Sequence, residues 1–219
     1  MLSKANLMRV LEIIGEMFPN AKGELNSETP FQLLIAVILS AQTTDKAVNM
    51  VTPALFEDYP TPQKLANAPI EDVMQKISRI GLYKNKSKNI IQTARMVHEL
   101  YQDEIPRTHE ALEKFPGVGR KTANVVLGDA FGIPGIAVDT HVERVSKRLR
   151  IVKKSASVKE VELALMQKIP KERWVLTHHQ LILFGRYHCT AKKPKCEICP
   201  VFSYCGEGQL ILKNSLNRH

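Results

Sequence analysis

The sequence predicts an all-α fold, and three observations support this prediction. Signals that start helices recur along the 219 residues, and several apolar stripes follow helical spacing. The alternation of apolar and polar residues that marks a strand is nowhere sustained. Asn-Gly and Asp-Gly hairpin turns are absent from the sequence. We therefore expect many short helices and no sheet.

The first two expected helices have clear signals. Residues 4–18 carry an apolar stripe at helical spacing. Thr29 suits an N-cap, Pro30 suits the first helical position, and Gln32 completes a capping box. Residues 33–39 are apolar all round, so we expect their helix to be the buried centre of a domain. The stripe in residues 4–18 consists of Leu7, Val10, Leu11, Ile14, Met17 and Phe18.

Further helices are expected along the rest of the chain. Start signals occur at residues 61–62 (Thr-Pro) and in the capping box of residues 157–160. Helical spacing continues from residue 84 to about residue 100 and over residues 172–184, where we expect Gly185 to end the helix.

Charge and composition restrict the class of protein. Lys and Arg number 31 against 22 Asp and Glu, so the formal net charge is +9 and favours a polyanionic partner. The longest uncharged apolar run, residues 33–39, is far shorter than the ~18 residues of a membrane span. No secretory cleavage site is visible, and we expect a soluble intracellular protein. Two glycines and a proline in residues 132–135 indicate an internal seam.

A helical hairpin is predicted near the middle of the chain. Thr108 suits the cap of a short helix, and a glycine turn then leads into a second helix that ends near Phe131. Gly117 and Gly119 permit positive φ, so the chain can turn tightly there and turn its backbone N–H groups outward, beside Arg120. Together with the second helix's N-terminus these groups form a phosphate site, which predicts DNA binding. The alternative is a hairpin that only grips the backbone non-specifically.

Lys121 lies in the first turn of that second helix. The positive end of the helix dipole and the neighbouring Arg120 both disfavour an ammonium, which favours the neutral amine. A neutral amine is a nucleophile that forms Schiff bases. The alternative is a phosphate-binding lysine that keeps its charge.

Asp139 follows 18 residues after Lys121 and begins a basic helix. By itself Asp139 is an N-cap, but its free side could assist Lys121 or stabilise positive charge on a sugar. We therefore assign it both roles. We expect His141 to be a polar residue of the DNA-binding region and not a catalytic base.

Four cysteines lie close together near the C-terminal end. A disulfide framework would join distant segments, so locally gathered thiols indicate a metal site. One Cys-x2-Cys pair flanked by gaps of six and five residues suits a [4Fe-4S] cluster, with zinc and free thiols as alternatives. The six-residue gap carries Lys192, Lys193 and Lys195, which we expect to face a phosphate backbone. The candidate ligands are Cys189, Cys196, Cys199 and Cys205.

Taken together, these elements resemble the endonuclease III family, bifunctional DNA glycosylases of the helix-hairpin-helix superfamily that carry an iron–sulfur cluster. The resemblance runs nearly from end to end. Phe115 stands where the family usually has leucine, an exchange that a core tolerates. Besides the cysteine spacing, the matching segments are residues 30–37, 39–45, 80–83, 115–126, 137–142 and 185–187.

The resemblance implies a two-lobed, all-α helix-hairpin-helix glycosylase fold. Residues 22–133 would form a six-helix barrel that includes the hairpin, at about 108–131. Residues 1–21 and 134–219 would form a discontinuous iron–sulfur domain, with the cluster in the loop 189–205. DNA would bind across the cleft between the lobes, where Lys121 and Asp139 would face each other.

The same resemblance implies a base-excision-repair DNA glycosylase with AP lyase activity. It would remove oxidised or ring-saturated pyrimidines of the thymine glycol type from duplex DNA. Lys121 would attack C1′ and form a Schiff base, Asp139 would balance the developing charge, and β-elimination would cut the strand 3′ to the lesion. Gln42 and Leu82 would fill the gap left by the extruded nucleotide.

The implied cofactor is a [4Fe-4S] cluster held by the four cysteines. The implied partner is double-stranded DNA that contains oxidised pyrimidines or abasic sites. We expect a monomer in the cytoplasm, associated with the nucleoid through DNA.

Two alternative functions remain at this point. An adenine–mismatch glycosylase of the same superfamily lacks the hairpin lysine, uses a glutamate early in its chain and carries an additional C-terminal domain. The presence of Lys121 argues against it. A non-enzymatic DNA-binding module with a structural metal would bind duplex DNA without cutting it.

Overall fold

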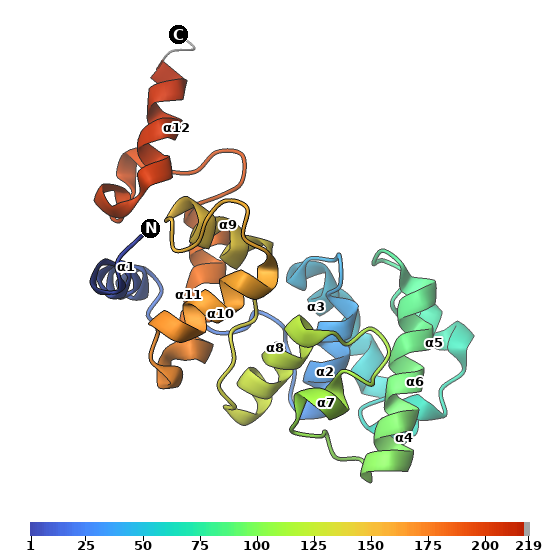
Figure 1. Cartoon of the computed structure of the whole chain (residues 1–219). Helices are drawn as coiled ribbons and strands as arrows, with labels where there is room; N and C mark the ends of the chain where they lie inside the picture. Colours follow the sequence, from blue (N-terminus) through green and yellow to red (C-terminus); the bar gives the residue numbers. More distant parts are fainter. Residues whose placement is uncertain (217–219) are drawn as a thin grey trace. The chain divides into compact units, whose positions relative to one another are not determined.

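The computed structural model describes residues 1–216, with side chains through residue 211. Within these residues every regular element is a helix and no strand occurs, so the all-α prediction is confirmed (Figure 1). Short 3₁₀ turns cover Lys171–Arg173, Cys196–Ile198 and Phe202–Tyr204. The α-helices are α1 (Lys4–Met17), α2 (Pro30–Leu39), α3 (Asp45–Asp58), α4 (Pro62–Ala66), α5 (Ile70–Lys76), α6 (Tyr83–Tyr101), α7 (His109–Leu112), α8 (Arg120–Phe131), α9 (Thr140–Arg148), α10 (Val158–Lys168), α11 (Trp174–Leu183) and α12 (Gly206–Leu216).

The chain forms two compact units, each with its own hydrophobic core. One is contiguous and spans Gly23–Ile133, which contains α2 to α8. The other is discontinuous and joins Met1–Lys22 to Pro134–His219. The boundary at Ile133 and Pro134 falls inside the seam of residues 132–135.

Helix α2 is the centre of the contiguous unit. Its residues from Phe31 to Leu39 are all buried, and it packs against α3, α6 and α8. Thr29 caps the helix by accepting from the amide of Gln32 (3.2 Å). The Gln32 side chain accepts from the amide of Glu28 (2.9 Å) and not from that of Thr29, so the expected capping box is shifted by one residue. Because the helix is buried on every side, it carries apolar residues all round, as the sequence predicts.

Helix α1 closes the discontinuous unit. Its buried face is Leu7, Val10, Leu11 and Ile14, and it lies against α11 (Figure 1). Gly15 lies so close to α11 that a Cβ there would be 3.2 Å from Nε2 of Gln180. The N-terminal and C-terminal parts of the chain therefore share one core.

The prediction that Gly185 ends a helix is wrong. After α11 the chain continues through a π-helical turn, Phe184–His188, and Gly185 lies inside that turn. A Cβ on Gly185 would be 2.9 Å from Cβ of His141 and 3.2 Å from Cγ2 of Val145, both on α9. The glycine therefore permits two helices to touch, and its position in the sequence alone could not distinguish this role from a stop.

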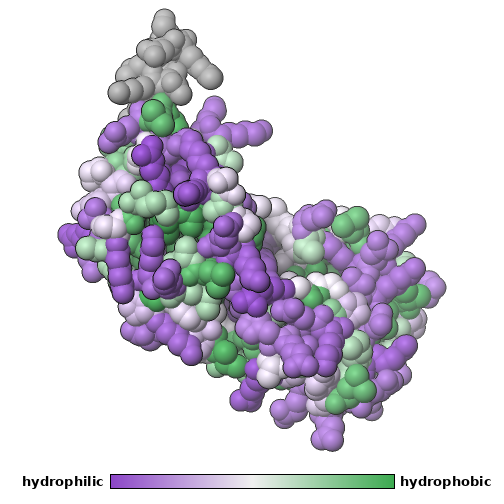
Figure 2. Space-filling view, viewed as in Figure 1, coloured by the Kyte–Doolittle hydropathy of each residue, from purple (hydrophilic) through white to green (hydrophobic). Residues whose placement is uncertain are grey.

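Most of the face drawn in Figure 2 is hydrophilic, and its apolar atoms occur in small separated patches. Among the residues that the structure describes, no helix combines the length and the apolar character that crossing a membrane requires.

Candidate functional site

The predicted hairpin is present as α7, a tight turn and α8. Thr108 caps α7 by accepting from the amide of Ala111 (3.3 Å). In the turn, the amide of Val118 donates to the carbonyl oxygen of Phe115 (3.0 Å), and Gly117 has a φ of 80°. Proline followed by a residue of positive φ is typical of a type II turn. A Cβ at Gly117 would also lie 3.1 Å from Nδ2 of Asn89. Both the positive φ and this close approach therefore favour glycine here.

Gly119 has a different role from the expected one. Its φ is −107° and its ψ is −177°, which is extended backbone, so it does not use the positive φ that a glycine permits. A Cβ built on Gly119 would meet nothing within 4 Å. Because this N-cap is a glycine, it offers no side-chain hydrogen bond to the first amides of α8. The glycine thus leaves the approach to the helix N-terminus open for an anion.

Lys121 and Arg120 stand at this open helix end. Both side chains are exposed, and Lys121 lies in the first turn of α8. The two helices of the hairpin are joined by a hydrogen bond between Nε2 of His109 on α7 and Oδ1 of Asn124 on α8 (2.7 Å). The sequence alone did not predict this contact. Gly117, Gly119, Arg120 and Lys121 are therefore brought together as one surface.

Gln42 and Leu82 lie in two exposed turns of the same unit, and both have unusual backbones. Gln42 follows α2 with a φ of 54°, and Leu82 precedes α6 with a φ of 59° and a ψ of 22°. Leu82 is 56% exposed, so its side chain is available to solvent or to a partner. Non-glycine residues in this left-handed region are strained, and such strain clusters at functional sites.

Asp139 is the N-cap of α9, in the discontinuous unit. Its Oδ1 accepts from the amides of His141 and Val142, both at 2.8 Å. Both of these capping bonds use Oδ1, and a second role for the carboxylate stays a prediction. His141 is half-buried, and its Nδ1 lies 3.2 Å from Nη2 of Arg144. Lys121 and Asp139 belong to different units, and their pairing stays a prediction.

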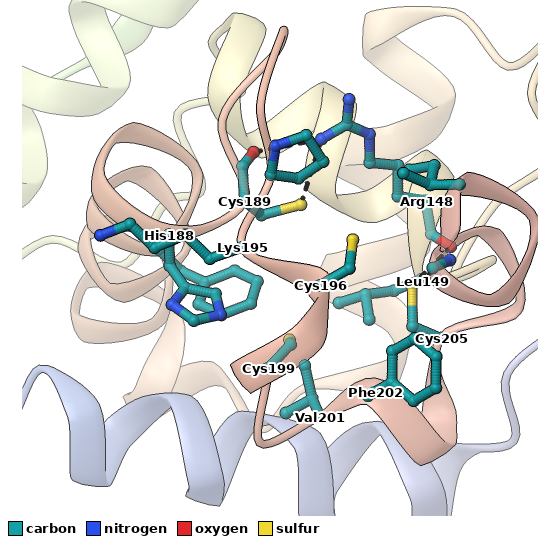
Figure 3. A pocket seen from close by; sticks show the side chains of 14 residues that line it. Arg148, Leu149, His188, Cys189, Lys195, Cys196, Cys199, Val201, Phe202 and Cys205 are labelled. Carbon is teal, nitrogen blue, oxygen red and sulfur yellow. Dashed lines mark hydrogen bonds between the residues drawn. The ribbon is translucent and has the colours of Figure 1, made fainter. Parts of the chain in front are cut away.

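The four cysteines line one pocket of the discontinuous unit (Figure 3). All four are free of disulfides, and three come from the short turns that connect the π-helical turn with α12. Apolar side chains close the remaining wall, which limits access of water to the sulfurs. These apolar neighbours are Leu149, Phe184, Val201 and Phe202.

The chemistry of this pocket fits a metal cluster. Burial raises the pKa of Cys199 to about 11, and burial also raises the pKa values of Cys196 and Cys205. Four thiolates gathered here therefore need a cationic centre to balance their charge. The amide of Gly208 donates to Sγ of Cys205 (3.3 Å), the kind of contact that tunes sulfur ligands.

Two arginines of α9 hold the start of the cysteine loop. Arg148 donates to the carbonyl oxygens of Thr190 (2.7 Å) and Ala191 (2.9 Å). Its Nη1 also donates to Sγ of Cys189 (3.3 Å; Figure 3). Arg144 donates to the carbonyl oxygen of Cys189 (3.2 Å). The sequence indicates only a basic helix here, because a backbone carbonyl acceptor leaves no signal in a sequence.

The loop presents its lysines to solvent. Lys192, Lys193 and Lys195 are all exposed, beyond the segment that Arg148 holds. A cation free in water can pair with a phosphate at little desolvation cost. The placement is therefore compatible with the predicted DNA contact.

Comparison with known families gives two matches. A family model described as "HhH-GPD superfamily base excision DNA repair protein" matches residues 35–171. A second, described as "Iron-sulfur binding domain of endonuclease III", matches residues 189–205, the span from the first cysteine to the last. The cofactor expected from the resemblance, a [4Fe-4S] cluster, is thereby confirmed.

Close relatives cover nearly the whole chain. Endonuclease III of Bacillus subtilis (strain 168) is 54% identical over 216 residues, covering 99% of both proteins. Endonuclease III of Escherichia coli (strain K12) is 46% identical over 204 residues, 93% of this chain and 96% of that protein.

Solved structures agree. The structure of a trapped endonuclease III–DNA covalent intermediate, an estranged-adenine complex, matches 97% of this chain and 100% of its own with a TM-score of 0.93 at 52% identity. A non-covalent endonuclease III–DNA complex matches with a TM-score of 0.94, at the same coverage and identity.

Proposed function

The chain belongs to the endonuclease III family of the HhH-GPD superfamily, and from this membership we propose its substrate and the residues that process it. Its activity is that of a base-excision-repair DNA glycosylase with AP lyase activity. The proposed substrates are duplex DNA with oxidised or ring-saturated pyrimidines, of the thymine glycol type, and abasic sites. Saturated pyrimidine rings are not planar, so they stack poorly and cost less to extrude from the helix.

Lys121 is the proposed nucleophile, and the observation that carries this assignment is its place in α8. The amine is exposed in the first turn of a helix whose N-cap, Gly119, leaves the approach open. A phosphate of the damaged strand bound to the open amides would bring the adjacent sugar toward Lys121.

The proposed reaction proceeds through an imine. The Nζ lone pair bonds to C1′ while the glycosidic bond breaks and its electron pair leaves with the base, which takes up a proton. The amine then loses its two protons while the bond from C1′ to O4′ breaks; one proton goes to O4′, the other to a base, and a C1′=N Schiff base results. Removal of a C2′ proton then expels the 3′ phosphate, which cuts the strand. Water finally hydrolyses the imine and restores the amine.

Asp139 is assigned the second catalytic role. Its Oδ1 holds the start of α9, while Oδ2 remains free to stabilise the cationic sugar or to accept a proton from the amine. One carboxylate can serve both purposes because both capping bonds use the same oxygen, Oδ1. Arg120 and His141 are assigned to the DNA backbone.

Gln42 and Leu82 are assigned to the gap that the extruded nucleotide leaves. An exposed leucine held outward by its backbone can insert between base steps, and a glutamine can hydrogen-bond to the unpaired base.

The four cysteines are the proposed ligands of the cluster, which supplies a structural staple when bound. The chain's own part is to hold a basic loop in place: Arg148 fixes its start, and Lys192, Lys193 and Lys195 contact phosphates. The two units are the proposed domains. Since one chain carries all these groups, we propose that the protein acts as a monomer. Because its proposed substrate is DNA, we propose that it acts in the cytoplasm, on the nucleoid.

A trapping experiment tests the role of Lys121. Wild-type protein should nick a thymine glycol duplex, and borohydride should reduce the imine to a stable protein–DNA adduct. Lys121→Gln should retain DNA binding but lose nicking and trapping by at least about a thousandfold, since no other amine replaces the nucleophile. Lys64→Gln, which removes an exposed lysine of α4, is the matched control and should behave as wild type.

Two outcomes would exclude this assignment. One is an adduct that persists in Lys121→Gln. The other is wild-type protein that binds the duplex with normal salt dependence and forms no adduct.

A further inference from the structure

Lys86 is a buried lysine that touches both turns of the proposed gap-filling residues. It is 4% exposed and lies one helical turn after Leu82, on α6. Its backbone amide makes the regular helical hydrogen bond to the carbonyl oxygen of Leu82 (3.0 Å), so Lys86 is fixed in the first turn of the helix that Leu82 caps. Its ammonium donates to Oγ1 of Thr43, the residue after Gln42, at 2.6 Å. The two ends of one residue thus reach two turns that are about forty positions apart in the sequence.

The contact with Thr43 extends across Gln42. The Thr43 hydroxyl donates in turn to the carbonyl oxygen of Ala41 (3.4 Å). The chain of donors from Lys86 therefore spans the peptides on both sides of Gln42, whose φ is 54°. A short polar chain of this kind favours the strained turn over relaxed alternatives.

The ammonium is buried at some cost in free energy. Among the described residues no carboxylate pairs with Lys86, and the Thr43 hydroxyl is its one hydrogen-bond partner. An ammonium can donate three hydrogen bonds, and burial without an anion is unfavourable. Accordingly, burial lowers the pKa of Lys86. A residue retained only for stability would be apolar here, like Ile90 and Ala94 further along the same buried face.

We propose that Lys86 is a positioning residue that sets Gln42 and Leu82 in register for insertion into the duplex, because its ammonium ties Thr43 to the first turn of α6, the helix that Leu82 caps. This inference deepens the proposed function, because it rests on the assignment of Gln42 and Leu82 to the gap. Lys86 itself touches neither the DNA nor the reacting atoms.

The test uses full-length, cluster-containing protein and two nearly isosteric substitutions. Lys86→Met keeps the apolar stem and removes the ammonium. Thr43→Val keeps the shape and removes the hydroxyl, whereas Thr43→Ser keeps the hydroxyl and serves as the conservative rescue. Lys88→Met, which removes an exposed lysine of the same helix, is the matched control.

Three measurements separate positioning from other effects. Single-turnover excision is measured on a thymine glycol duplex, and strand cleavage is measured on a duplex with a preformed abasic site. A 2-aminopurine placed opposite the lesion reports, by its fluorescence, when that base loses its stacking partners. Thermal unfolding gives the stability of each variant.

We expect Lys86→Met and Thr43→Val to slow both excision and the 2-aminopurine signal by about tenfold, the loss of one hydrogen bond to a charged group. The double variant should be no slower than either single one, since both remove the same contact. Cleavage of the abasic duplex should fall less, because no base has to leave the stack. Thr43→Ser and Lys88→Met should match wild type, and Lys86→Met should unfold at the same temperature or higher.

Three results would overturn the inference. The first is normal excision and a normal 2-aminopurine signal in both Lys86→Met and Thr43→Val. The second is a melting temperature that falls along with activity, which indicates a structural role. The third is a smaller salt dependence of DNA binding in Lys86→Met, which indicates a phosphate contact.

The same assay distinguishes a failure of the underlying assignment. If Gln42→Ala and Leu82→Ala leave the 2-aminopurine signal unchanged, the gap-filling assignment is wrong and the inference falls with it. If those two variants slow the signal while Lys86→Met does not, only the role of Lys86 is wrong.

Discussion

At the scale of single residues, the proposed DNA-binding surface of the contiguous unit includes backbone conformations that most side chains avoid. Gly117, Gln42 and Leu82 all have positive φ, and only the first is a glycine. A glycine adopts this region freely, whereas glutamine and leucine need neighbouring contacts to hold them there. The glycine therefore shapes the hairpin by its own conformational freedom, while the turn at Gln42 has the contact between Lys86 and Thr43 beside it.

The two hairpin glycines should respond differently to alanine. Gly117→Ala should destabilise the contiguous unit by about 1–2 kcal/mol, because its φ of 80° is unfavourable for alanine and its Cβ would crowd Asn89. Gly119→Ala should change stability by less than about 0.5 kcal/mol, since its backbone is extended and its Cβ meets nothing. Urea unfolding measures both differences.

DNA affinity should fall in both variants, for different reasons. Gly117→Ala distorts the turn, while Gly119→Ala adds a methyl group at the N-cap of α8, which a bound phosphate would have to accommodate. Gly119→Ala with normal affinity would mean that no phosphate binds at this helix end.

Some of these residues could be predicted from the sequence, and others could not. Lys121 and the glycine turn were recognisable because the hairpin, the helix start and the lysine are adjacent in the chain. Lys86 was missed because its partner lies far away in sequence. Its one signal was its place four residues before Ile90, in line with the buried stripe of α6, where an apolar residue is expected.

At the scale of helices, the starts were predicted better than the ends. Thr61, Thr108, Asp139 and Ser157 all cap helices as expected, because capping is a contact between residues two or three positions apart. The helix end expected at Gly185 was wrong, because this glycine is needed for the close contact with α9, which lies about forty residues earlier in the chain. Local chemistry can be read from a sequence, and distant packing cannot.

The capping box of α10 predicts a pH effect. The backbone amide and hydroxyl of Ser157 donate to the carboxylate of Glu160 (2.7 and 2.8 Å), and these bonds lower the pKa of Glu160. A lowered pKa means that the stabilisation is fully present above the ordinary value of 4.5 and is lost as the pH falls through the folded value.

The side chain of Glu160→Gln does not titrate, so this variant lacks the change in stability with pH that the Glu160 carboxylate causes. The melting temperature of wild type should exceed that of Glu160→Gln at neutral pH, and the difference should shrink in acid. Circular dichroism melts between pH 3 and 7 measure it, and a difference independent of pH would contradict the capping role.

At the scale of the whole molecule, the net charge of +9 predicts salt-dependent binding to DNA. If the cysteine loop contacts phosphates, changing Lys192 and Lys193 to Gln should make the slope of log K against log salt shallower by about 0.9 for each phosphate that the loop no longer neutralises. Titrations at several salt concentrations measure the slope. Lys159→Gln, an exposed lysine of α10, is the control, and an equal change there would indicate only a general loss of charge.

The sharing of one core by the first and last parts of the chain has a consequence for synthesis on the ribosome. The contiguous unit can fold as soon as Ile133 has left the exit tunnel, whereas α1 waits for α11, whose last residue is Leu183. At about 5–20 residues per second, that wait lasts on the order of 8–30 seconds. During this time Leu7, Val10, Leu11 and Ile14 have no native cover, so a nascent chain is most open to chaperones and to misassociation at its very beginning.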